Sequence, residues 1–193
     1  MIKIEDVVSN VRVYGLEESI MASKYPMSVD ISTLNSDVTP RVIALAQSEK
    51  GEGHDNWLLG VVVQFDLTLT IKAWTEAERY HFFDIVSSQS TMHRITKFDL
   101  DKSYIKYTDK RMIDIMKELV ADYNQNPTDE KYLRILYSNP DGMKLTARMS
   151  TNYRQLKTMH SQRKPHRLPE WKAFCAWIES LPHSEFITGK KEN

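Results

Sequence analysis

The chain has 193 residues, and its 26 basic and 26 acidic side chains cancel to a formal net charge of zero at pH 7. A neutral chain lacks the broad positive field on which non-specific binding to nucleic acid or to a membrane surface depends. Neither partner is therefore expected, and any anion site must be local. At this length one domain is expected, with roughly 70% of the extended surface buried on folding.

Cysteine usage and the first residues indicate the compartment. Cys175 is the only cysteine, which excludes an intrachain disulfide, and no Cys/His cluster has the spacing of zinc ligands, so no metal site is expected. The N-terminal stretch "MIKIEDVVSN" alternates in charge, and no apolar run approaches the roughly 18 residues of a membrane span. These features predict a soluble cytoplasmic protein.

The N-terminal part of the chain is expected to form short strands followed by two helices. Residues 2–8 ("IKIEDVV") and 11–15 ("VRVYG") have strand character, and 16–25 ("LEESIMASKY") predicts a short helix before the turn at Pro26. Residues 39–51 ("TPRVIALAQSEKG") predict a second helix, with threonine at the N-cap, proline at the first helical position and glycine as the stop.

The clearest strand pattern lies at residues 57–74 ("WLLGVVVQFDLTLTIKAW"). An apolar run passes into alternation, which places four apolar side chains on one face, Phe65, Leu67, Leu69 and Ile71. A helix is expected to follow over 75–83 ("TEAERYHFF"), with Thr75 as its cap. This helix would deliver three polar side chains near its end, Arg79, Tyr80 and His81.

A polar stretch follows at residues 87–94 ("SSQSTMHR"). Its hydroxyls, amide, imidazole and guanidinium are groups that suit an anion-binding site. Hydroxyl-rich segments are also ordinary helix stops, so a solvated loop that caps the preceding helix is the alternative interpretation. The residues of this stretch alone leave both interpretations open.

The remainder of the chain predicts a helical half, with helices over 109–125, 128–140, 149–164 and 168–182. The first of these helices has four apolar residues at helical spacing, Met112, Ile115, Met116 and Leu119. We interpret its methionines as core rather than as a cofactor contact. The last helix places Cys175 on an apolar face with Trp171, Phe174 and Ile178, which favours a packed thiol over a nucleophile.

The predicted helix over 149–164 carries candidate chemistry at both ends. Asn152 and Arg154 fall on its first turn, Arg163 falls near its last turn, and His166 lies just beyond. A guanidinium is a rigid donor fork that suits a phosphate or a paired carbonyl and imide edge. On this helix alone, the alternative that both arginines are solvated charges stays open.

Three motifs, in this order along the chain, resemble those of flavin-dependent thymidylate synthases. The family's Gly-His-acid turn before a long strand is matched by "GHDNWLLGVVVQF" at 53–65. Its Arg-His-Arg signature, followed after seven or eight residues by Ser, is matched by Arg79, Tyr80, His81 and then Ser90. Its late Asn-x-Arg-x-Leu motif, with a later Arg, His and Trp, is matched by Asn152, Arg154, Leu156, Arg163, His166 and Trp171.

The resemblance implies an α+β fold in which a mainly antiparallel sheet packs against the helical half. We expect one domain over 1–187, followed by a polar tail at 188–193. The resemblance also implies a homotetramer that binds FAD between subunits. Such an enzyme would transfer a one-carbon unit from methylenetetrahydrofolate to dUMP, with NADPH as the reductant.

The resemblance also implies a role for particular residues. The flavin would be bordered by His54, Arg79, His81, Asn152, Arg154 and His166. The nucleotide, mostly its phosphate, would be held by Gln89, Ser90, Arg94 and Arg148. Arg163 would face the pyrimidine carbonyl and imide and stabilise negative charge that develops on the ring, as a substrate-binding and catalytic residue.

The chain departs from the family pattern around the signature. Tyr80 stands where the family has His, and His81 stands where it has Arg. The family's Asn-Glu before the Ser is replaced by other polar residues, and the Arg expected two residues after the Ser is found as Arg94, four residues after it. Two alternatives therefore remain: a related pyrimidine modification such as hydroxymethylation, or a non-catalytic oligomer that binds a nucleotide or a protein partner.

Overall fold

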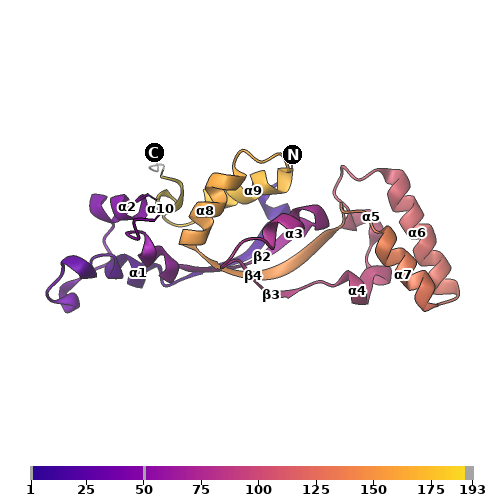
Figure 1. The fold of residues 1–193 in the computed structure, drawn as a ribbon, viewed down its shortest axis with the longest axis horizontal. Coiled ribbons are helices and arrows are strands. Elements are labelled where there is room, and N and C mark those ends of the chain that lie inside the picture. Colours follow the sequence, from indigo (N-terminus) through magenta and orange to yellow (C-terminus); the bar gives the residue numbers. More distant parts are fainter. Residues whose placement is uncertain (1, 50, 190–193) are drawn as a thin grey trace. The chain divides into compact units, whose positions relative to one another are not determined.

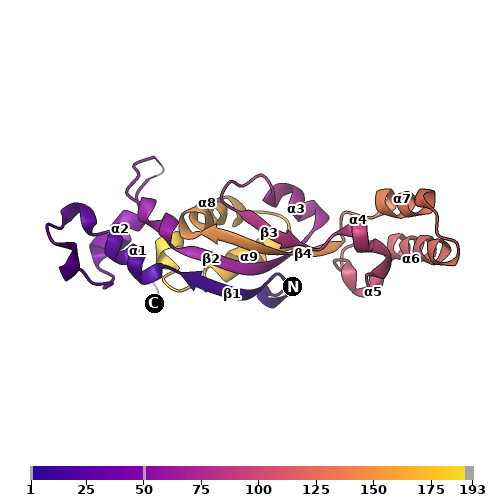
Figure 2. The same cartoon turned by 90° about the horizontal axis from the view of Figure 1, so that it is seen from below.

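A four-stranded sheet with the strand order β1-β2-β4-β3 organises the computed structural model, which describes residues 2–49 and 51–189 (Figures 1 and 2). The strands are β1 (Val8–Tyr14), β2 (Val62–Thr70), β3 (Asp84–Ser88) and β4 (Lys144–Asn152). β1 and β2 are antiparallel. β2 and β4 are antiparallel as well, because the Tyr153 amide donates to the Val61 carbonyl and the Ile71 amide to the Met143 carbonyl. The predicted α+β class with a mainly antiparallel sheet is confirmed.

The described chain divides into two compact units, and β2 and β4 each contribute residues to both of them. Unit 1 comprises Met1–Leu67, Tyr80–Val86 and Arg148–Asn193. Unit 2 comprises Thr68–Arg79 and Ser87–Ala147. The predicted domain limits of 1–187 stay a prediction, and of the predicted polar tail, Thr188 ends a helix while 190–193 lie outside the described residues.

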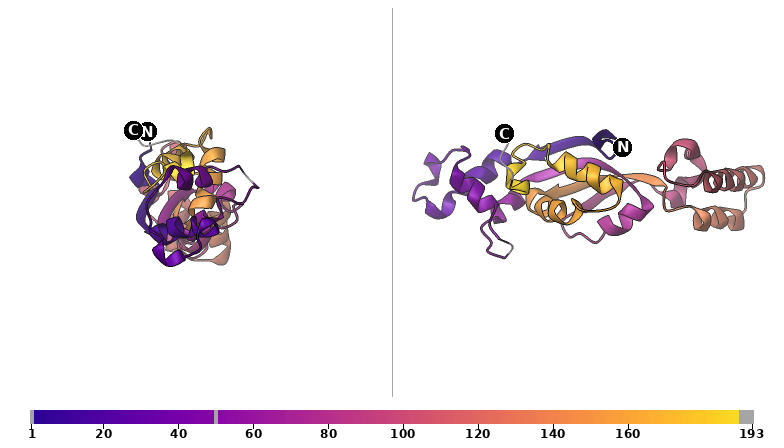
Figure 3. Two further views of the ribbon diagram at one scale, coloured as in Figure 1. Left: turned by 90° about the vertical axis from the view of Figure 1, so that its left-hand side faces the viewer. Right: turned by 90° about the horizontal axis from the view of Figure 1, so that it is seen from above.

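Unit 1 packs helices on one face of the sheet, and an aromatic cluster fills the space between them. Figures 1 and 3 show α8 and α9 against this face. The ring of Phe65 on β2 lies 4.4 Å from that of Trp177 and 6.1 Å from that of Phe174, both on α9. The helices of this unit are α1 (Leu16–Ala22), α2 (Pro40–Ala46), α8 (Tyr153–Arg163), α9 (Pro169–Ile178) and α10 (Glu185–Thr188), and its 3-10 turns are Ile4–Asp6, Tyr25–Met27, Ile31–Thr33 and Asn56–Gly60.

Unit 2 has its own apolar core, built from a helical hairpin and the segments packed against it. Met116 of α6 and Ile135 of α7 are buried in this core together with Met143 and Ile95. The helices of this unit are α3 (Ile71–Ala77), α4 (Thr91–Arg94), α5 (Leu100–Ser103), α6 (Lys110–Gln125) and α7 (Asp129–Ser138), and Ile95–Lys97 forms a 3-10 turn. A separate core in each unit explains why both are compact.

The helix after β2 begins and ends earlier than predicted. The Oγ1 atom of Thr70 accepts a hydrogen bond from the Ala73 amide at 3.2 Å, so Thr70 is the N-cap and Ile71 is helical rather than part of the strand. Thr75 lies inside the helix, where its hydroxyl donates to the Lys72 carbonyl at 2.8 Å. Because α3 ends at Ala77, Arg79, Tyr80 and His81 follow the helix instead of lying on it.

The two later strands were not predicted. β4 includes Met149–Thr151, which were expected to be helical, and the helix starts only after Asn152, whose Oδ1 caps it by accepting from the Gln155 amide. The signal for β4 was alternation, because Ala147, Met149 and Thr151 are buried while the residues between them are not. All five residues of β3 are exposed, and such an edge strand carries no apolar period to detect.

On α6, the buried face differs from the predicted one. Met116 is buried as predicted, but Met112 is 41% exposed, so interpreting Met112 as core was wrong. Ile115, at the same helical spacing, is 46% exposed. The other α6 residues that pack on the core of unit 2 are Ile113, Leu119, Val120 and Tyr123, of which Leu119 belongs to the predicted set. The buried face is therefore shifted around the helix axis relative to the predicted face. The sequence did not distinguish the two faces, because the apolar residues of each are at helical spacing.

Other local predictions are confirmed. α1 lies within the predicted range, and Thr39 caps α2 with Pro40 in its first turn, although α2 already ends at Ala46. Thr128 caps α7. On α9, the four residues predicted to share an apolar face are all buried, Trp171, Phe174, Cys175 and Ile178. No helix within residues 2–49 and 51–189 is both long and apolar enough for a membrane span.

Candidate functional site

A cavity of about 630 Å³ opens in unit 1 along one side of α8. Its wall includes three of the residues predicted to border a flavin, His81, Asn152 and Arg154. Asn152 is at this wall because it ends β4 and caps α8, and Arg154 follows on the first turn of that helix. Gln155, Lys157 and His160 of the same helix also line the cavity. Polar residues of one helix face therefore define the site.

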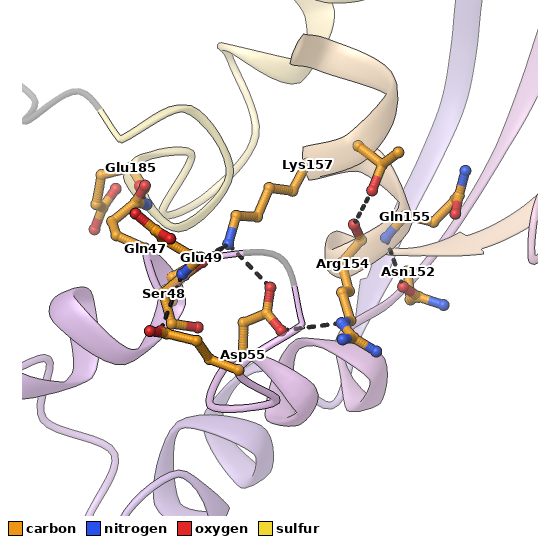
Figure 4. A network of polar contacts seen from close by, with 12 residues as sticks. Gln47, Ser48, Glu49, Asp55, Asn152, Arg154, Gln155, Lys157 and Glu185 are labelled. Atoms are coloured by element: carbon orange, nitrogen blue, oxygen red, sulfur yellow. Dashed lines mark hydrogen bonds and ion pairs between the residues drawn. The ribbon is translucent and has the colours of Figure 1, made fainter. Parts of the chain in front are cut away.

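Asp55, the acid of the Gly-His-acid turn, organises one wall of this cavity (Figure 4). Its side chain is only 7% exposed, and it accepts hydrogen bonds from Arg154 Nε at 3.0 Å and from Lys157 Nζ at 2.9 Å. Two opposite charges and their hydrogen bonds compensate the cost of burying the carboxylate. The turn thereby fixes two cations of α8 at the cavity wall.

The two cations that pair with Asp55 differ in how many of their hydrogen-bond donors remain available to a ligand. Lys157 also donates to the carbonyls of Ala46 and Ser48, at 2.7 and 3.0 Å, which uses all three of its donors. Arg154 donates to Asp55 only through its Nε. Its terminal amino groups have no partner among the residues that the structure describes. Arg154 is therefore the donor that this wall presents to an anion.

Arg163 lies at the other end of α8, packed against two aromatic rings. Its guanidinium carbon is 4.6 Å from the ring centre of Trp171 and 5.1 Å from that of Tyr80. Its Nε donates to the Tyr80 hydroxyl at 2.7 Å, and that hydroxyl donates to Gln162 at 2.8 Å. Tyr80, one of the departures from the family signature, is thus a direct partner of the predicted catalytic arginine.

The carboxylate that follows α9 contacts two further basic groups, one on α8 and one directly after it. Glu179 accepts from Lys164 Nζ at 2.7 Å and from His160 Nε2 at 3.0 Å. The hydrogen bond from Lys164, followed by that from His160, lowers the pKa of Glu179 to about 2. His160 is buried and lines the cavity, whereas Glu179 is not among the lining residues. The hydrogen bond between His160 and Glu179 therefore fixes a residue of the cavity wall from outside the cavity.

The polar stretch 87–94 lies in unit 2, where Gln89, Ser90 and Arg94 line a further cavity of about 330 Å³. Gln89 is fixed there, because its amide donates to the Thr146 carbonyl and its side chain accepts from the Thr146 amide, both at 2.9 Å. The stretch does not cap the preceding helix, which ends at Ala77. Ser90 is the N-cap residue of α4, but its hydroxyl makes no capping hydrogen bond.

Arg148 lies on β4 in unit 1 and contacts two other strands. Its Nη1 donates to the Asn10 carbonyl on β1 at 2.8 Å and to Asp66 on β2 at 3.2 Å. The hydrogen bond from Asn10, assisted by Arg148, lowers the pKa of Asp66. Arg148 is therefore held on the sheet by a charged and a neutral acceptor.

The remaining predicted residues lie outside the two cavity walls. His54 is exposed beside Asp55, and Arg79 is exposed in unit 2 after α3. His166 accepts a hydrogen bond at Nδ1 from the Leu168 amide, and its ring centre is 6.5 Å from that of Trp171. The structure thus groups His81 with Asn152 and Arg154, and Gln89 with Ser90 and Arg94, within one unit each.

Four site residues were not predicted from the sequence. Asp55 was noted only as the acid of a motif, and Lys157 only as part of a helix; their pairing depends on the tertiary fold. Lys97 and Phe98 line the cavity of unit 2 beside Arg94. For Lys97 a signal existed, because it lies three residues after Arg94 and adds a second cation to the same short segment.

Cys175 is buried in α9, and burial raises the pKa of its thiol to about 11. This agrees with the interpretation of a packed thiol. Among residues 2–49 and 51–189 there is no group of three or more His, Cys, Asp or Glu side chains that could hold a metal ion.

No protein-family model matches the chain, and no curated protein matches it in sequence. Solved structures do match it. The flavin-dependent thymidylate synthase ThyX from Helicobacter pylori, complexed with FAD and dUMP, superposes with a TM-score of 0.75 at 14% identity, covering 96% of this chain and 100% of its own. Another structure of that protein, also with FAD and dUMP, gives a TM-score of 0.73 at 15% identity over 93% of this chain and 98% of its own.

A third match is the UMP/dUMP methylase PolB from Streptomyces cacaoi, bound with 5-Br dUMP. Its TM-score is 0.64 at 13% identity, and the match covers 94% of this chain and 96% of PolB. At such low identity these matches show a shared fold. The resemblance to flavin-dependent thymidylate synthases that the sequence motifs predicted is thus confirmed for the fold, over nearly the whole chain.

Proposed function

We propose that this chain is a divergent enzyme of the flavin-dependent thymidylate synthase type, which transfers a one-carbon unit from methylenetetrahydrofolate to dUMP using reduced FAD. The observation that carries the proposal is the grouping of the predicted residues. Three residues assigned to the flavin line one cavity, and three assigned to the nucleotide line another. His81 is far from Asn152 and Arg154 in the sequence, so the meeting of these three residues in one cavity is support that the motif order did not supply.

The cavity in unit 1 fits a flavin dinucleotide in size and in donor chemistry. A volume of about 630 Å³ is within the usual range of cofactor sites, roughly 300 to 1,000 Å³. Arg154 offers two terminal amino groups to an anionic pyrophosphate, and Asn152 and Gln155 add amide groups. FAD would be bound here by Arg154, Asn152 and His81, and when bound it supplies the reducing chemistry.

The protein's own part in the reaction is to position the nucleotide and polarise its ring. Gln89, Ser90, Arg94 and Arg148 are proposed to hold dUMP, mostly by its phosphate, and the first three line the cavity in unit 2. Arg163 is proposed to donate to the pyrimidine carbonyl as negative charge develops on it. Stacking on Trp171 and the hydrogen bond to Tyr80 fix its guanidinium plane, as electrostatic stabilisation requires.

NADPH as the reductant and a homotetrameric assembly are also proposed, and both come from the resemblance. His54, Arg79 and His166, which lie outside the two cavity walls, keep their proposed flavin roles in such an assembly. A shared site between subunits would bring in side chains that a single chain does not supply.

The specific observation that favours a second candidate is the Tyr80–Arg163 hydrogen bond. A signature residue of different chemistry touches the proposed catalytic arginine, so the same scaffold could perform another pyrimidine modification, such as hydroxymethylation. The match to PolB, a UMP/dUMP methylase, is compatible with variation of chemistry on this fold. A non-catalytic oligomer that binds a nucleotide or a protein partner is the third candidate.

Flavin binding separates the enzyme candidates from the non-catalytic one. The purified protein is expected to be yellow, or to become so on incubation with FAD, and Arg154→Ala is expected to weaken FAD binding. Arg134→Ala, which removes an exposed arginine of α7, is the matched control and should bind FAD like the wild type. A colourless protein that FAD does not reconstitute would reject both enzyme candidates.

Growth of a thymidine-requiring host separates the two enzyme candidates. The wild-type chain is expected to restore growth without thymidine, and Arg163→Ala is expected to fail, because loss of one such donor costs about 100- to 1,000-fold in rate. A flavin-loaded wild-type protein that does not restore growth would favour the other pyrimidine modification.

A further inference from the structure

Three polar residues from three neighbouring strands of unit 1 meet on the sheet face opposite α9. Phe65 points toward α9, so the next residue of β2, Asp66, points to the other face. There Asn10 Nδ2 donates to Asp66 Oδ2 at 2.5 Å, and Arg148 Nη1 donates to both Asp66 Oδ1 and the Asn10 carbonyl. Each member of this Asn10–Asp66–Arg148 triangle contacts the other two.

The triangle depends on an irregularity in β1. The register runs from Ser9 opposite Asp66 to Arg12 opposite Gln64, so β1 uses one residue more than β2 over this step. Such a bulge leaves a residue outside the regular ladder. Asn10 has a φ of 51°, in the left-handed region that asparagine tolerates better than most residues. Its carbonyl is thereby available to accept from Arg148.

Asp66 and Arg148 are placed opposite each other by the register of β2 and β4. Residue 61 bonds to 153 and residue 71 to 143, so residue 66 faces residue 148 in this antiparallel pair. The carboxylate is 25% exposed and the arginine side chain 29%. Pairs of opposite charge at directly facing positions stabilise a sheet and restrict the rotamers of the longer side chain.

Only one nitrogen of the Arg148 guanidinium is used in this arrangement. Nη1 makes both hydrogen bonds, whereas Nε and Nη2 have no partner anywhere in the described ranges 2–49 and 51–189. Nε and Nη2 form one edge of the planar guanidinium, and such an edge can bind two oxygens of a phosphate at once. An arginine held at one nitrogen and open along the opposite edge is oriented for a bidentate anion contact.

We propose that Asn10 and Asp66 are positioning residues that hold Arg148 with its Nε–Nη2 edge ready for the nucleotide phosphate. This inference rests on the proposed function, which assigns Arg148 to that phosphate. Ordering a long side chain on binding costs about 0.5 to 1.5 kcal/mol, which corresponds to about a 2- to 12-fold change in affinity. Ordering Arg148 before binding removes this cost.

The test measures binding of dUMP and of deoxyuridine, which lacks the phosphate, to FAD-incubated protein by titration calorimetry. Asp66→Ala is expected to weaken dUMP binding about 2- to 12-fold and to leave deoxyuridine binding unchanged. Arg148→Ala should weaken dUMP binding more, and the double variant should be no weaker than Arg148→Ala alone, because Asp66 acts through Arg148. Asp122→Ala breaks a more exposed ion pair of unit 2 with Lys131 and serves as the matched control.

Asn10 supplies a second, independent set of variants. Asn10→Gly keeps the carbonyl and the left-handed backbone, so dUMP affinity should stay within about twofold of the wild type. Asn10→Val disfavours that conformation and should weaken dUMP binding as Asp66→Ala does. This difference between Gly and Val tests the carbonyl contact without changing any charge.

The outcomes separate the two levels of the proposal. If the wild type binds dUMP and Asp66→Ala weakens dUMP and deoxyuridine equally, or adds fully to Arg148→Ala, the positioning role is wrong and the nucleotide function stands. Unchanged dUMP affinity in Asp66→Ala would have the same meaning. A wild-type protein that binds no dUMP would overturn the proposed function, and the positioning role with it.

Discussion

The two units treat their candidate ligand-binding arginines differently. In unit 1, Arg154 is paired with Asp55, whose side chain is 7% exposed, and Arg148 with Asp66, which is 25% exposed. In unit 2, Arg94 has no side-chain partner within the described residues. Four aspartates of unit 2 that pair with a lysine or arginine, Asp99, Asp101, Asp109 and Asp122, lie on its surface, with side chains 49% to 71% exposed.

The difference shows two ways to build an anion site. A guanidinium that a sheltered carboxylate holds is oriented before the ligand arrives, and the carboxylate reduces the net positive charge of the site. A guanidinium without a partner keeps its full charge but must be ordered on binding. Changes at the first kind of site should therefore affect stability and binding together, whereas changes at the second kind should affect binding alone.

Charge reversal at Arg94 should give the largest effect and tests the second kind of site. Arg94→Glu is expected to raise the Kd for dUMP at least about 100-fold, because it removes a donor and adds a repulsive charge beside the phosphate. The melting temperature should stay nearly unchanged, since no folded-state partner is lost. Calorimetric titration with dUMP and thermal unfolding of the same samples measure both quantities.

The control for this prediction is Arg134→Glu, a charge reversal at an exposed position of α7 in the same unit. It should leave both the Kd and the melting temperature near the wild-type values. Unchanged dUMP affinity in Arg94→Glu would remove the stretch 87–94 from the nucleotide site and leave it as a solvated polar segment without a ligand.

Removal of the Asp55 carboxylate should give the next largest effect and tests the first kind of site. Asp55→Ala leaves Arg154 and Lys157 without their counter-ion, and we expect a loss of about 1 to 3 kcal/mol in the free energy of unfolding. The value is below that for fully buried pairs, because Arg154 and Lys157 are 35% and 22% exposed and water can replace part of the lost contact. Urea denaturation measures it, and FAD affinity should fall in parallel.

Asp122→Ala is again the appropriate control, because its carboxylate is 55% exposed and pairs with a single lysine. Its unfolding free energy should change by less than about 0.5 kcal/mol. If Asp55→Ala destabilised the protein no more than Asp122→Ala, pairing with a sheltered carboxylate would not contribute to stability. The proposed energetic difference between paired and unpaired arginines would then be wrong.

Sequence patterns predicted the elements whose signal is local. The cap and proline of α2, the apolar face of α9 and the alternation of Phe65, Leu67 and Leu69 all belong to one segment each, and all are found in the structure. The motif order predicted the fold, which the match to solved structures confirms. Predictions from such local signals were correct because the signals do not depend on what the segment packs against.

The predictions that failed needed tertiary information. The exposed edge strand β3 has no apolar period, and two faces of α6 were equally compatible with helical spacing until the partner surface was known. The same holds for the site. Asp55 and Arg154 are 99 residues apart and Asp66 and Arg148 are 82 apart, so only the folded chain shows that these pairs meet.

Glu179 allows a smaller test of unit 1, based on pH. Its folded-state pKa of about 2 is below the ordinary value of 4.5, because Lys164 and then His160 bond to the ionised carboxylate. A depressed carboxyl pKa gives stability that is fully present above the ordinary value and is lost as pH falls through the folded value. The window is therefore about pH 4.5 down to about pH 2.

Glu179→Gln should be slightly less stable than the wild type at pH 7, and the gap in melting temperature should close as pH falls from about 4.5 toward 2. The effect is small because the side chains of Glu179 and Lys164 are 38% and 46% exposed, so solvent screens their attraction. Glu118→Gln, at an exposed position of α6 in unit 2, should show no such closing gap. A gap for Glu179→Gln that is the same at pH 7 and pH 3 would mean that the charge of Glu179 does not help to hold α9 against α8.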